Sequence, residues 1–148
     1  MCGIYGIIST SKNIIDSSLI VNGLKRLQHR GKDGFGIVSL VNGEYKVDKY
    51  SGTIVKNIPS IAPAYAYLGH NRYSTSGKHL NTNEIYLNEQ QPMSGYFQED
   101  IFWLVHNGNV SLNQDINQDI NQDHDTQYII DYISNTKASD MSEALISL

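Results

Sequence analysis

The dipeptide Asn42-Gly43 is the feature that most constrains how this chain can fold. It separates two runs, residues 35–41 and 44–50, whose composition is typical of β-strands. Asn and Gly readily adopt the positive φ values that both central residues of a tight hairpin turn require. The dipeptide therefore predicts an antiparallel pair of strands.

Other runs predict further strands and amphipathic helices. Short apolar runs predict buried strands, and apolar residues at a period close to 3.6 predict helices with one buried face. We expect strands at residues 3–9, 64–73 and 101–106, and helices at 16–28, from Asp125 onward and at 141–148. Glycines at both ends of the polar segment 69–77 favour a site where functional side chains are presented.

Two stretches lack a clear pattern of secondary structure. Residues 78–95 are rich in Asn and Gln and are predicted to form a long loop. The tetrapeptide at 113–116 is repeated at 117–120, which is a low-complexity pattern. Since Leu112, Ile116 and Ile120 recur every four residues, the repeat is compatible either with disorder or with one helical stripe.

Composition narrows the class of protein. A length of 148 residues with 40% hydrophobic residues fits one globular domain, residues 1–148. The formal net charge is −4 and the basic residues are scattered, so nucleic acid is not an expected partner. No apolar run approaches the roughly 18 residues that a membrane span needs. The single cysteine fits a reducing compartment, and we expect a cytoplasmic protein.

Cys2 is the only cysteine, and it follows the initiator methionine. Removal of Met1 would leave Cys2 with a free α-amine, a group whose pKa of about 7.7 to 8.0 lets it accept the proton of a thiol. Cys2 is therefore a candidate nucleophile that carries its own base. The alternative is a small buried apolar residue near the start of the chain.

The five histidines do not form a pattern typical of metal ligands. They lie at positions 29, 70, 79, 106 and 124, without paired spacing and with one cysteine only. We expect neither a metal site nor a cofactor, and we expect His70 and His106 to be buried, hydrogen-bonded strand residues.

Four separated segments together resemble the class II glutamine amidotransferases. They are CGI at residues 2–4, LQHRGKDGFGI at 27–37, GHNRYSTSG at 69–77 and VHNGN at 105–109. The likeness is greatest to the glutaminase domains of the amidophosphoribosyltransferases and extends from residue 2 to about residue 133. The pair Asp125-Thr126 is also similar to a segment of glucosamine-6-phosphate synthase.

This resemblance implies a fold and a reaction. The fold is α+β, the four-layer αββα sandwich of N-terminal-nucleophile hydrolases, here shortened at its C-terminal end. The reaction is hydrolysis of the side-chain amide of glutamine to glutamate and ammonia through a Cys2 γ-glutamyl thioester. No cofactor is implied.

The resemblance also assigns roles to individual residues. The catalytic residues are Cys2, with Asn107 and Gly108 as donors to the oxyanion. Residues that bind the substrate are Arg72, Thr75, Asp125, Arg30 and Gly31. From the residues alone, Asn107-Gly108 also fits a hairpin turn, Arg72 a surface salt bridge and Asp125 an ordinary N-cap. The alignment around Asp125 can also slide to Asp123.

Two departures from the family pattern leave alternatives open. The sequence Asp33-Gly34-Phe35 replaces the Asp-Ser-Ala that is usual in relatives, and we expect the sandwich to lack its last strands. The alternative function is a catalytically inactive glutamine-binding or regulatory module. The expected partners are L-glutamine and either a separate ammonia-accepting synthase or a second copy of the chain, with residues 141–148 at the contact. The catalytic mechanism requires removal of Met1.

Overall fold

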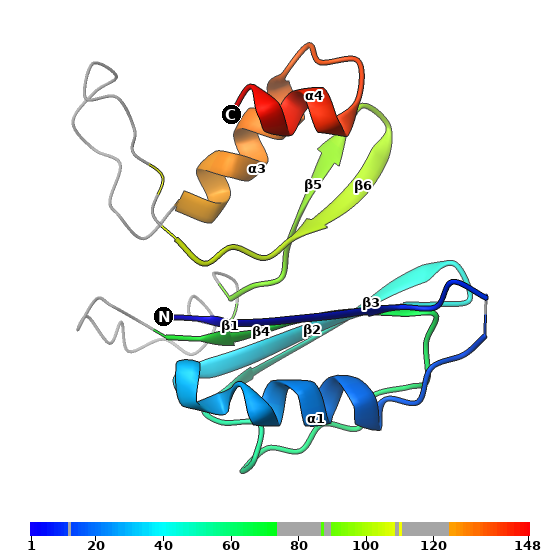
Figure 1. Ribbon diagram of the computed structural model, residues 1–148, viewed down its shortest axis with the longest axis vertical. Helices are drawn as coiled ribbons and strands as arrows, with labels where there is room; N and C mark the ends of the chain where they lie inside the picture. The colour runs from blue at the N-terminus through cyan, green and yellow to red at the C-terminus, as the bar shows by residue number, and fades with distance from the viewer. Residues whose placement is uncertain (12, 74–86, 88–89, 109, 111–124) are drawn as a thin grey trace. The chain divides into compact units, whose positions relative to one another are not determined.

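The computed structural model describes residues 1–11, 13–73, 87, 90–108, 110 and 125–148. These residues divide into two compact units (Figure 1). The first unit contains Met1–Pro92 and Val105–Asn107, and the second contains Met93–Leu104 and Gly108–Leu148. The repeat at 113–124 and most of the predicted loop at 78–95 lie outside the described residues.

A four-stranded antiparallel sheet forms the centre of the first unit. Its strands are β1 (Gly3–Ile8), β4 (Ala66–Arg72), β2 (Gly34–Val41) and β3 (Glu44–Ser51), in the order β1-β4-β2-β3. The register sets Gly3 opposite Asn71, and Gly34 opposite Arg72. The strands predicted at 3–9 and 64–73 are thereby confirmed.

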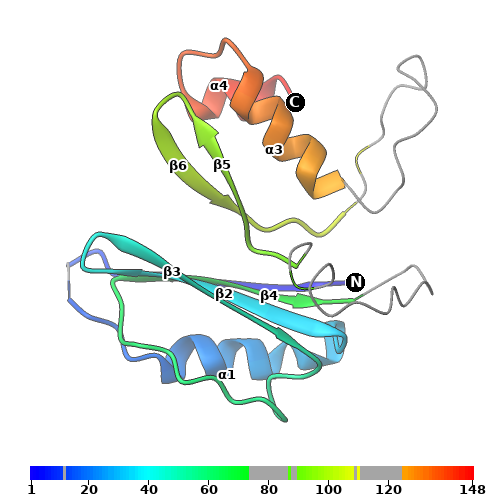
Figure 2. The same ribbon diagram turned by 180° about the vertical axis from the view of Figure 1, so that it is seen from behind.

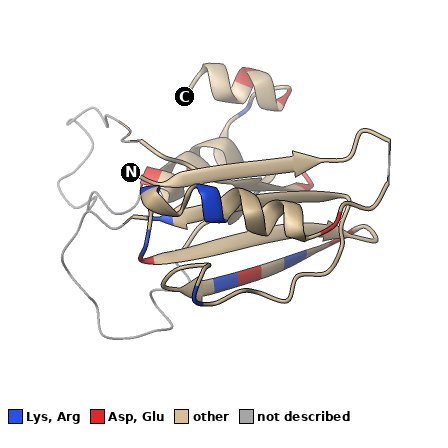
Figure 3. Cartoon of the chain, turned by 60° about the horizontal axis from the view of Figure 1, so that its bottom comes forward, with Lys and Arg blue, Asp and Glu red and all other residues tan. Residues whose placement is uncertain are grey.

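The predicted hairpin is present and joins β2 to β3. Asn42 and Gly43 have φ values of 52° and 86°, the left-handed conformation that this tight turn requires. Along β3, Lys46, Asp48 and Lys49 alternate in sign (Figure 3). Because β3 lies at an edge of the sheet, these charges protect the edge from pairing with another strand.

One face of the sheet is covered by helix α1 (Ser18–Arg26), which is followed by the short 3₁₀ helix η1 (Gln28–Arg30) (Figures 1 and 2). The helix predicted at 16–28 is confirmed, with its start at Ser18, whose backbone N–H donates to Asp16 Oδ1 at 2.8 Å. Its apolar side chains pack against those of β2 and β4. The resulting core includes Ile20, Leu24, Phe35, Ile37 and Tyr67.

Strand β1 differs from the prediction in its burial. Ile4 is 39% exposed and Ile8 is 75% exposed, although an apolar run with glycines predicted a buried strand. The reason is that β1 is an edge strand, paired on one side only. Alternation along β1 places Tyr5 on the α1 face, where a Cβ atom on Gly23 would lie 2.2 Å from the Tyr5 ring.

The second unit combines a two-stranded antiparallel sheet with two helices. Its elements are β5 (Met93–Phe97), β6 (Asp100–Leu104), α3 (Asp125–Asn135) and α4 (Met141–Ile146). Both predicted helices are confirmed. The predicted loop at 78–95 is wrong at its end because β5 begins at Met93. The strand predicted at 101–106 ends at Leu104 and is half-buried rather than buried.

Local hydrogen bonds explain how α4 begins. The side chain of Asp140 accepts a hydrogen bond from the backbone N–H of Glu143 at 2.9 Å, and Glu143 in turn accepts from the Ser139 backbone at 2.7 Å. The Asp140 side chain thereby satisfies one of the donors that the helix leaves free in its first turn, and the Glu143 side chain ties that turn to the residue before the cap.

Antiparallel sheets with few helices confirm the α+β class. The four-layer sandwich and the single domain stay predictions. None of the helices in the described part of the chain is long and apolar enough to span a membrane.

Candidate active site at the start of strand β1

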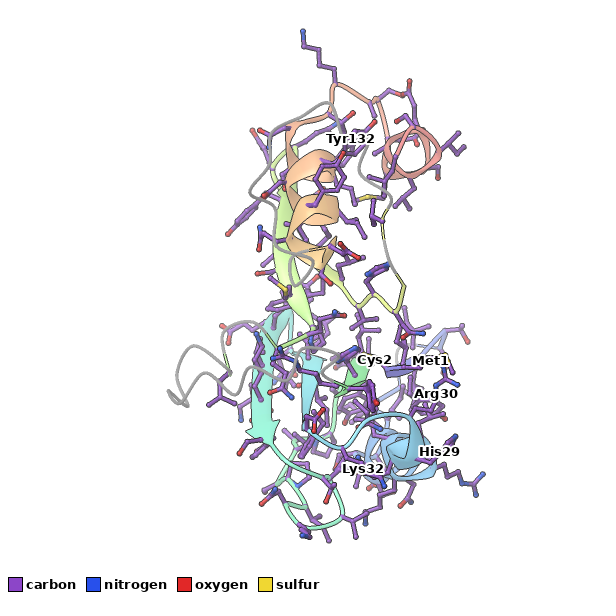
Figure 4. All side chains as sticks on the ribbon, turned by 90° about the vertical axis from the view of Figure 1, so that its left-hand side faces the viewer. Met1, Cys2, His29, Arg30, Lys32 and Tyr132 are labelled. Atoms are coloured by element: carbon purple, nitrogen blue, oxygen red, sulfur yellow. The ribbon has the colours of Figure 1, made fainter. Side chains whose placement is uncertain are left out.

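Cys2 directly precedes β1 and is held at three of its atoms. Its backbone N–H donates to Asn107 Oδ1 at 2.8 Å, and its carbonyl oxygen accepts from Arg30 Nε at 2.9 Å. Its Sγ lies 3.9 Å from the carbonyl oxygen of Tyr73. Figure 4 shows Met1, Cys2 and Arg30 at the same end of the first unit. Segments far apart in the sequence therefore converge on this cysteine.

Two glycines allow the backbone around Cys2 to pack closely. A Cβ atom on Gly3 would lie 3.0 Å from Leu27 Cβ. A Cβ atom on Gly31 would lie 2.6 Å from the carbonyl oxygens of both Asn71 and Arg72. The turn at Gly31 therefore lies directly against the end of β4, and a side chain there would separate them.

Asn71 joins the end of α1 to β4. The residue is fully buried, and its Nδ2 donates to the carbonyl oxygen of Leu24 at 2.8 Å. Leu24 lies in the last turn of α1, and its carbonyl oxygen also accepts from the backbone N–H of Leu27 at 3.1 Å. The bond from Asn71 fixes the helix end, and thus the following Arg30, relative to the sheet.

Arg72 lies level with Cys2 on the sheet. Gly3 is opposite Asn71, so the residue before Gly3 is level with the residue after Asn71. Because the Asn71 side chain points towards α1, alternation places Arg72 and His70 on the other face of the sheet, together with Cys2. The predicted nucleophile Cys2 and the predicted substrate-binding residue Arg72 thus share one face and one end of the sheet.

His70 is a neutral residue within this face. It is 1% exposed, and its pKa falls from 6.5 to about 4 because burial and the positive charge of Arg72 disfavour the imidazolium form. The backbone of His106 acts in the opposite direction, by less. The predicted burial is confirmed. The predicted hydrogen bond stays a prediction: neither ring nitrogen has a partner in good hydrogen-bond geometry among the described residues, although the backbone of His106 lies near enough to favour the imidazolium form.

Asn107 lies beyond the end of β6 and is exposed. Since its Oδ1 accepts from Cys2, its Nδ2 group is left to donate elsewhere. The preceding residue, His106, is half-buried and outside any strand, contrary to prediction, and its backbone N–H donates to Gln91 Oε1 at 2.6 Å.

The remaining predicted residues lie outside the described part of the first unit. Gly108 follows Asn107 in the chain and belongs to the second unit, as does Asp125, the first residue of α3. Asp125 Oδ2 accepts a hydrogen bond from the backbone N–H of Val110 at 3.0 Å. Thr75 lies outside the described residues.

Sequence reasoning missed two residues of this site. Asn71 lies inside a quoted motif, and the alternation of β4 could have indicated that it faces α1. No sequence pattern indicates a role for Gln91, because it falls within residues 78–95, which are predicted to form a loop. Among the residues that the structure describes, no group of three or more His, Cys, Asp or Glu side chains could hold a metal ion.

Comparison with known proteins finds relatives of two kinds, although no family model matches the chain. Over 87 residues, 56% of this chain, it is 37% identical to the glutamine–fructose-6-phosphate aminotransferase of Sulfolobus acidocaldarius, of which the match covers 15%. Over 115 residues, 74% of this chain, it is 33% identical to the amidophosphoribosyltransferase of Lacticaseibacillus casei, of which the match covers 55%. The chain therefore spans only part of each relative.

Solved structures show the same fold. The allosteric regulatory enzyme of purine biosynthesis matches 99% of this chain with a TM-score of 0.70 and 23% identity, and the match covers 32% of that enzyme. Glutamine phosphoribosylpyrophosphate amidotransferase from B. subtilis matches 99% of this chain with a TM-score of 0.58 and 25% identity, and the match covers 29% of it.

Proposed function

The chain belongs to the N-terminal domains of the class II glutamine amidotransferases, and on that premise we propose that it hydrolyses the side-chain amide of L-glutamine to glutamate and ammonia. The observation that carries the proposal is the 2.8 Å hydrogen bond between the backbone nitrogen of Cys2 and Asn107 Oδ1. This bond holds the candidate nucleophile beside the candidate donor to the oxyanion.

Cys2 acts as the nucleophile once Met1 has been removed. The nitrogen that donates to Asn107 then becomes a free α-amine, which accepts the thiol proton directly or through one water molecule. As an amine it can still donate to Asn107 Oδ1, so processing preserves the position of the nucleophile. The carbonyl oxygen of Cys2 keeps its bond to Arg30.

Asn107 and Gly108 stabilise the charge that develops during attack. The Oδ1 atom of Asn107 is occupied by the nitrogen of Cys2, which directs the Nδ2 donors to another acceptor. The Nδ2 group and the backbone N–H of Gly108 supply two donors from adjacent residues to the oxyanion of the tetrahedral intermediate.

The reaction then proceeds in two steps, formation of the γ-glutamyl thioester and its hydrolysis. The sulfur forms a bond to the side-chain carbonyl carbon of glutamine, the carbon–nitrogen bond breaks, and the proton held by the amine leaves with the nitrogen as ammonia. Water next adds to the γ-glutamyl thioester, gives a proton to the amine, and displaces the thiolate of Cys2. Glutamate is released and the thiol recovers its proton.

Recognition of a free amino acid requires groups for its carboxylate and its ammonium. Arg72 offers a planar two-pronged donor to the carboxylate, and Asp125 offers a carboxylate to the ammonium. Thr75 and Gly31 contribute to the same substrate site. Because Arg30 Nε is already bonded to the carbonyl oxygen of Cys2, Arg30 contributes by holding the nucleophile as well as by lining the site.

We also propose that the ammonia is transferred to an acceptor molecule. Both kinds of relatives are named as transferases, and we extend the transfer of a group to the present chain. Ammonia released into water is protonated and diluted, so direct delivery to a synthase site would preserve its reactivity. That site can belong to the same polypeptide or to a separate one.

The test combines mass, labelling and turnover. Intact mass should show the loss of Met1, an electrophilic analogue of glutamine should add once, at Cys2, and glutamine should yield equal amounts of glutamate and ammonia. A processed, folded protein that neither releases ammonia nor takes up the label would refute the proposal. Calorimetric binding of glutamine by that same protein would instead indicate the non-catalytic binding module.

A further inference from the structure

We infer that Gln91 is a positioning residue for the oxyanion site, which it holds in place through the backbone of His106; this rests on the proposed function. The Oε1 atom of Gln91 accepts the backbone N–H of His106 at 2.6 Å. The next residue, Asn107, makes the 2.8 Å bond to the nitrogen of Cys2. Two consecutive residues are therefore held by hydrogen bonds: His106 by the side chain of Gln91, and Asn107 by the backbone nitrogen of Cys2.

The segment that carries Asn107 needs such a bond because residues 105–107 lie outside any strand. A residue within a strand is placed by its ladder of backbone hydrogen bonds, whereas this segment depends on side chains. An exposed residue without a ladder samples several positions unless its neighbours are tied down. The bond from Gln91 supplies this restraint directly beside Asn107.

Gln91 is itself held against the sheet by close backbone contact. A Cβ atom on Gly36 would lie 2.2 Å from the carbonyl oxygen of Gln91 and 3.1 Å from Pro92 Cδ. A Cβ atom on Gly34 would lie 2.6 Å from Gln90 Nε2. Because Gly34 and Gly36 have no side chains, residues 90–92 can pack directly against the backbone of β2.

The preceding residue anchors the segment to β3. Gln90 is fully buried, and its Nε2 donates to the carbonyl oxygen of Tyr50 at 3.1 Å. The ring of Tyr50 stacks on Phe35 at 4.8 Å, so this anchor belongs to the core hairpin. A continuous chain of contacts consequently leads from the core through Gln91 to the site.

Loss of the Gln91 acceptor should affect turnover more than substrate binding. A catalytic donor displaced by about 1 Å can lower the rate by roughly 100-fold, while binding energy from remote groups is retained. We therefore expect Gln91→Met, which keeps the chain length and removes the acceptor, to lower kcat about 10- to 100-fold with KM changed by less than about threefold.

Two matched variants separate positioning from a general loss of structure. Gln91→Glu keeps an acceptor at the same distance from the backbone and should recover most of the lost kcat. Gln98→Met makes the same substitution at an exposed glutamine whose Nε2 donates to Ser139 O at 3.3 Å in the second unit, and it should leave kcat unchanged. Thermal unfolding of all three variants reports their folded state.

Amide hydrogen exchange supplies a measurement that is independent of turnover. The His106 amide should be protected in the parent protein and should exchange faster in Gln91→Met. If the parent does not hydrolyse glutamine, the proposed function fails, while exchange at His106 still tests the role of Gln91. Fast exchange of His106 in the parent, or kcat of folded Gln91→Met within about a factor of two of the parent, overturns the inference. If Gln91→Met does not fold, the inference is tested by two other results: protection of the His106 amide in the parent, and a kcat of Gln91→Glu close to that of the parent.

Discussion

The two faces of the four-stranded sheet differ in what their side chains do. The face towards α1 is filled by apolar groups such as Phe35 and Ile37, which are fully buried. The opposite face carries Cys2, His70 and Arg72 near one end, where Cys2 is level with Arg72 and His70 lies two residues before Arg72 on β4. Because side chains alternate along a strand, one sheet can keep its stabilising contacts separate from its chemistry.

Strand β2 shows the same contrast within a few residues. Phe35 and Ile37 fill the core, while Gly34 and Gly36, which alternate with them, place no side chain on the other face. That bare backbone lets the segment with Gln91 approach the sheet. The comparison predicts that substitutions on the two faces will have separable effects on turnover and on stability.

The largest effect should follow substitution of Cys2. Cys2→Ala removes the nucleophile and should lower kcat by about 10⁴-fold or more. The free energy of unfolding should change by less than about 0.5 kcal/mol, because the side chain is only partly buried. Ammonia release and urea unfolding measure the two quantities, and a large loss of stability would contradict the separation of the two faces.

Asn107→Asp should have the next largest effect. The aspartate keeps an oxygen that can accept from the nitrogen of Cys2, but it loses the Nδ2 donors. We expect kcat to fall by a factor of about 10² to 10³, equivalent to roughly 3 to 4 kcal/mol in the barrier. Unchanged turnover at saturating glutamine would show that these donors do not serve the oxyanion.

A core substitution should give the opposite result. Ile20→Ala, at a fully buried position of α1, should lower the free energy of unfolding by about 3 kcal/mol through lost burial and the cavity that remains. Turnover per folded molecule, measured well below the transition temperature, should stay close to that of the parent. A fall in kcat comparable to that of Asn107→Asp would mean that the two faces are coupled.

The smallest effect concerns pH and His70. Its pKa is lowered to about 4 from 6.5, so between these values the unfolded chain binds a proton that the folded protein does not. Stability is therefore complete above about pH 6.5 and declines as pH falls towards 4, by about 2 kcal/mol at pH 5. Urea unfolding at pH 7 and pH 5 should show this loss in the parent and a smaller one in His70→Leu. Equal losses in the two proteins would assign the pH dependence to other groups.

The sequence was most informative where local chemistry alone determines the structure. The turn at Asn42-Gly43 could be predicted because few residue pairs accept two positive φ values. The motifs around Cys2, Arg72 and Asn107 could be found because the resemblance preserves their order, and the structure brings these three segments together.

Other features depend on tertiary contacts that no local pattern records. Strand β5 contains Ser94 and Gly95, which are weak strand formers, and forms because it pairs with β6 and lies against Ile130. The exposure of Ile8 follows from its place on an edge strand. The bond from Gln91 to His106 depends on glycines of β2 far away in the sequence.

The turn at Asn42-Gly43 also offers a practical attachment point. A Cβ atom on Gly43 would have nothing within 4 Å, and the turn lies at the opposite end of the β2–β3 hairpin from Gly34, which is level with Arg72. Exposed loop tips of this kind tolerate inserted residues well. A short peptide carrying a fluorophore or an affinity tag could be inserted there, so that the protein can be immobilised or tracked while Cys2 stays open to its reagents.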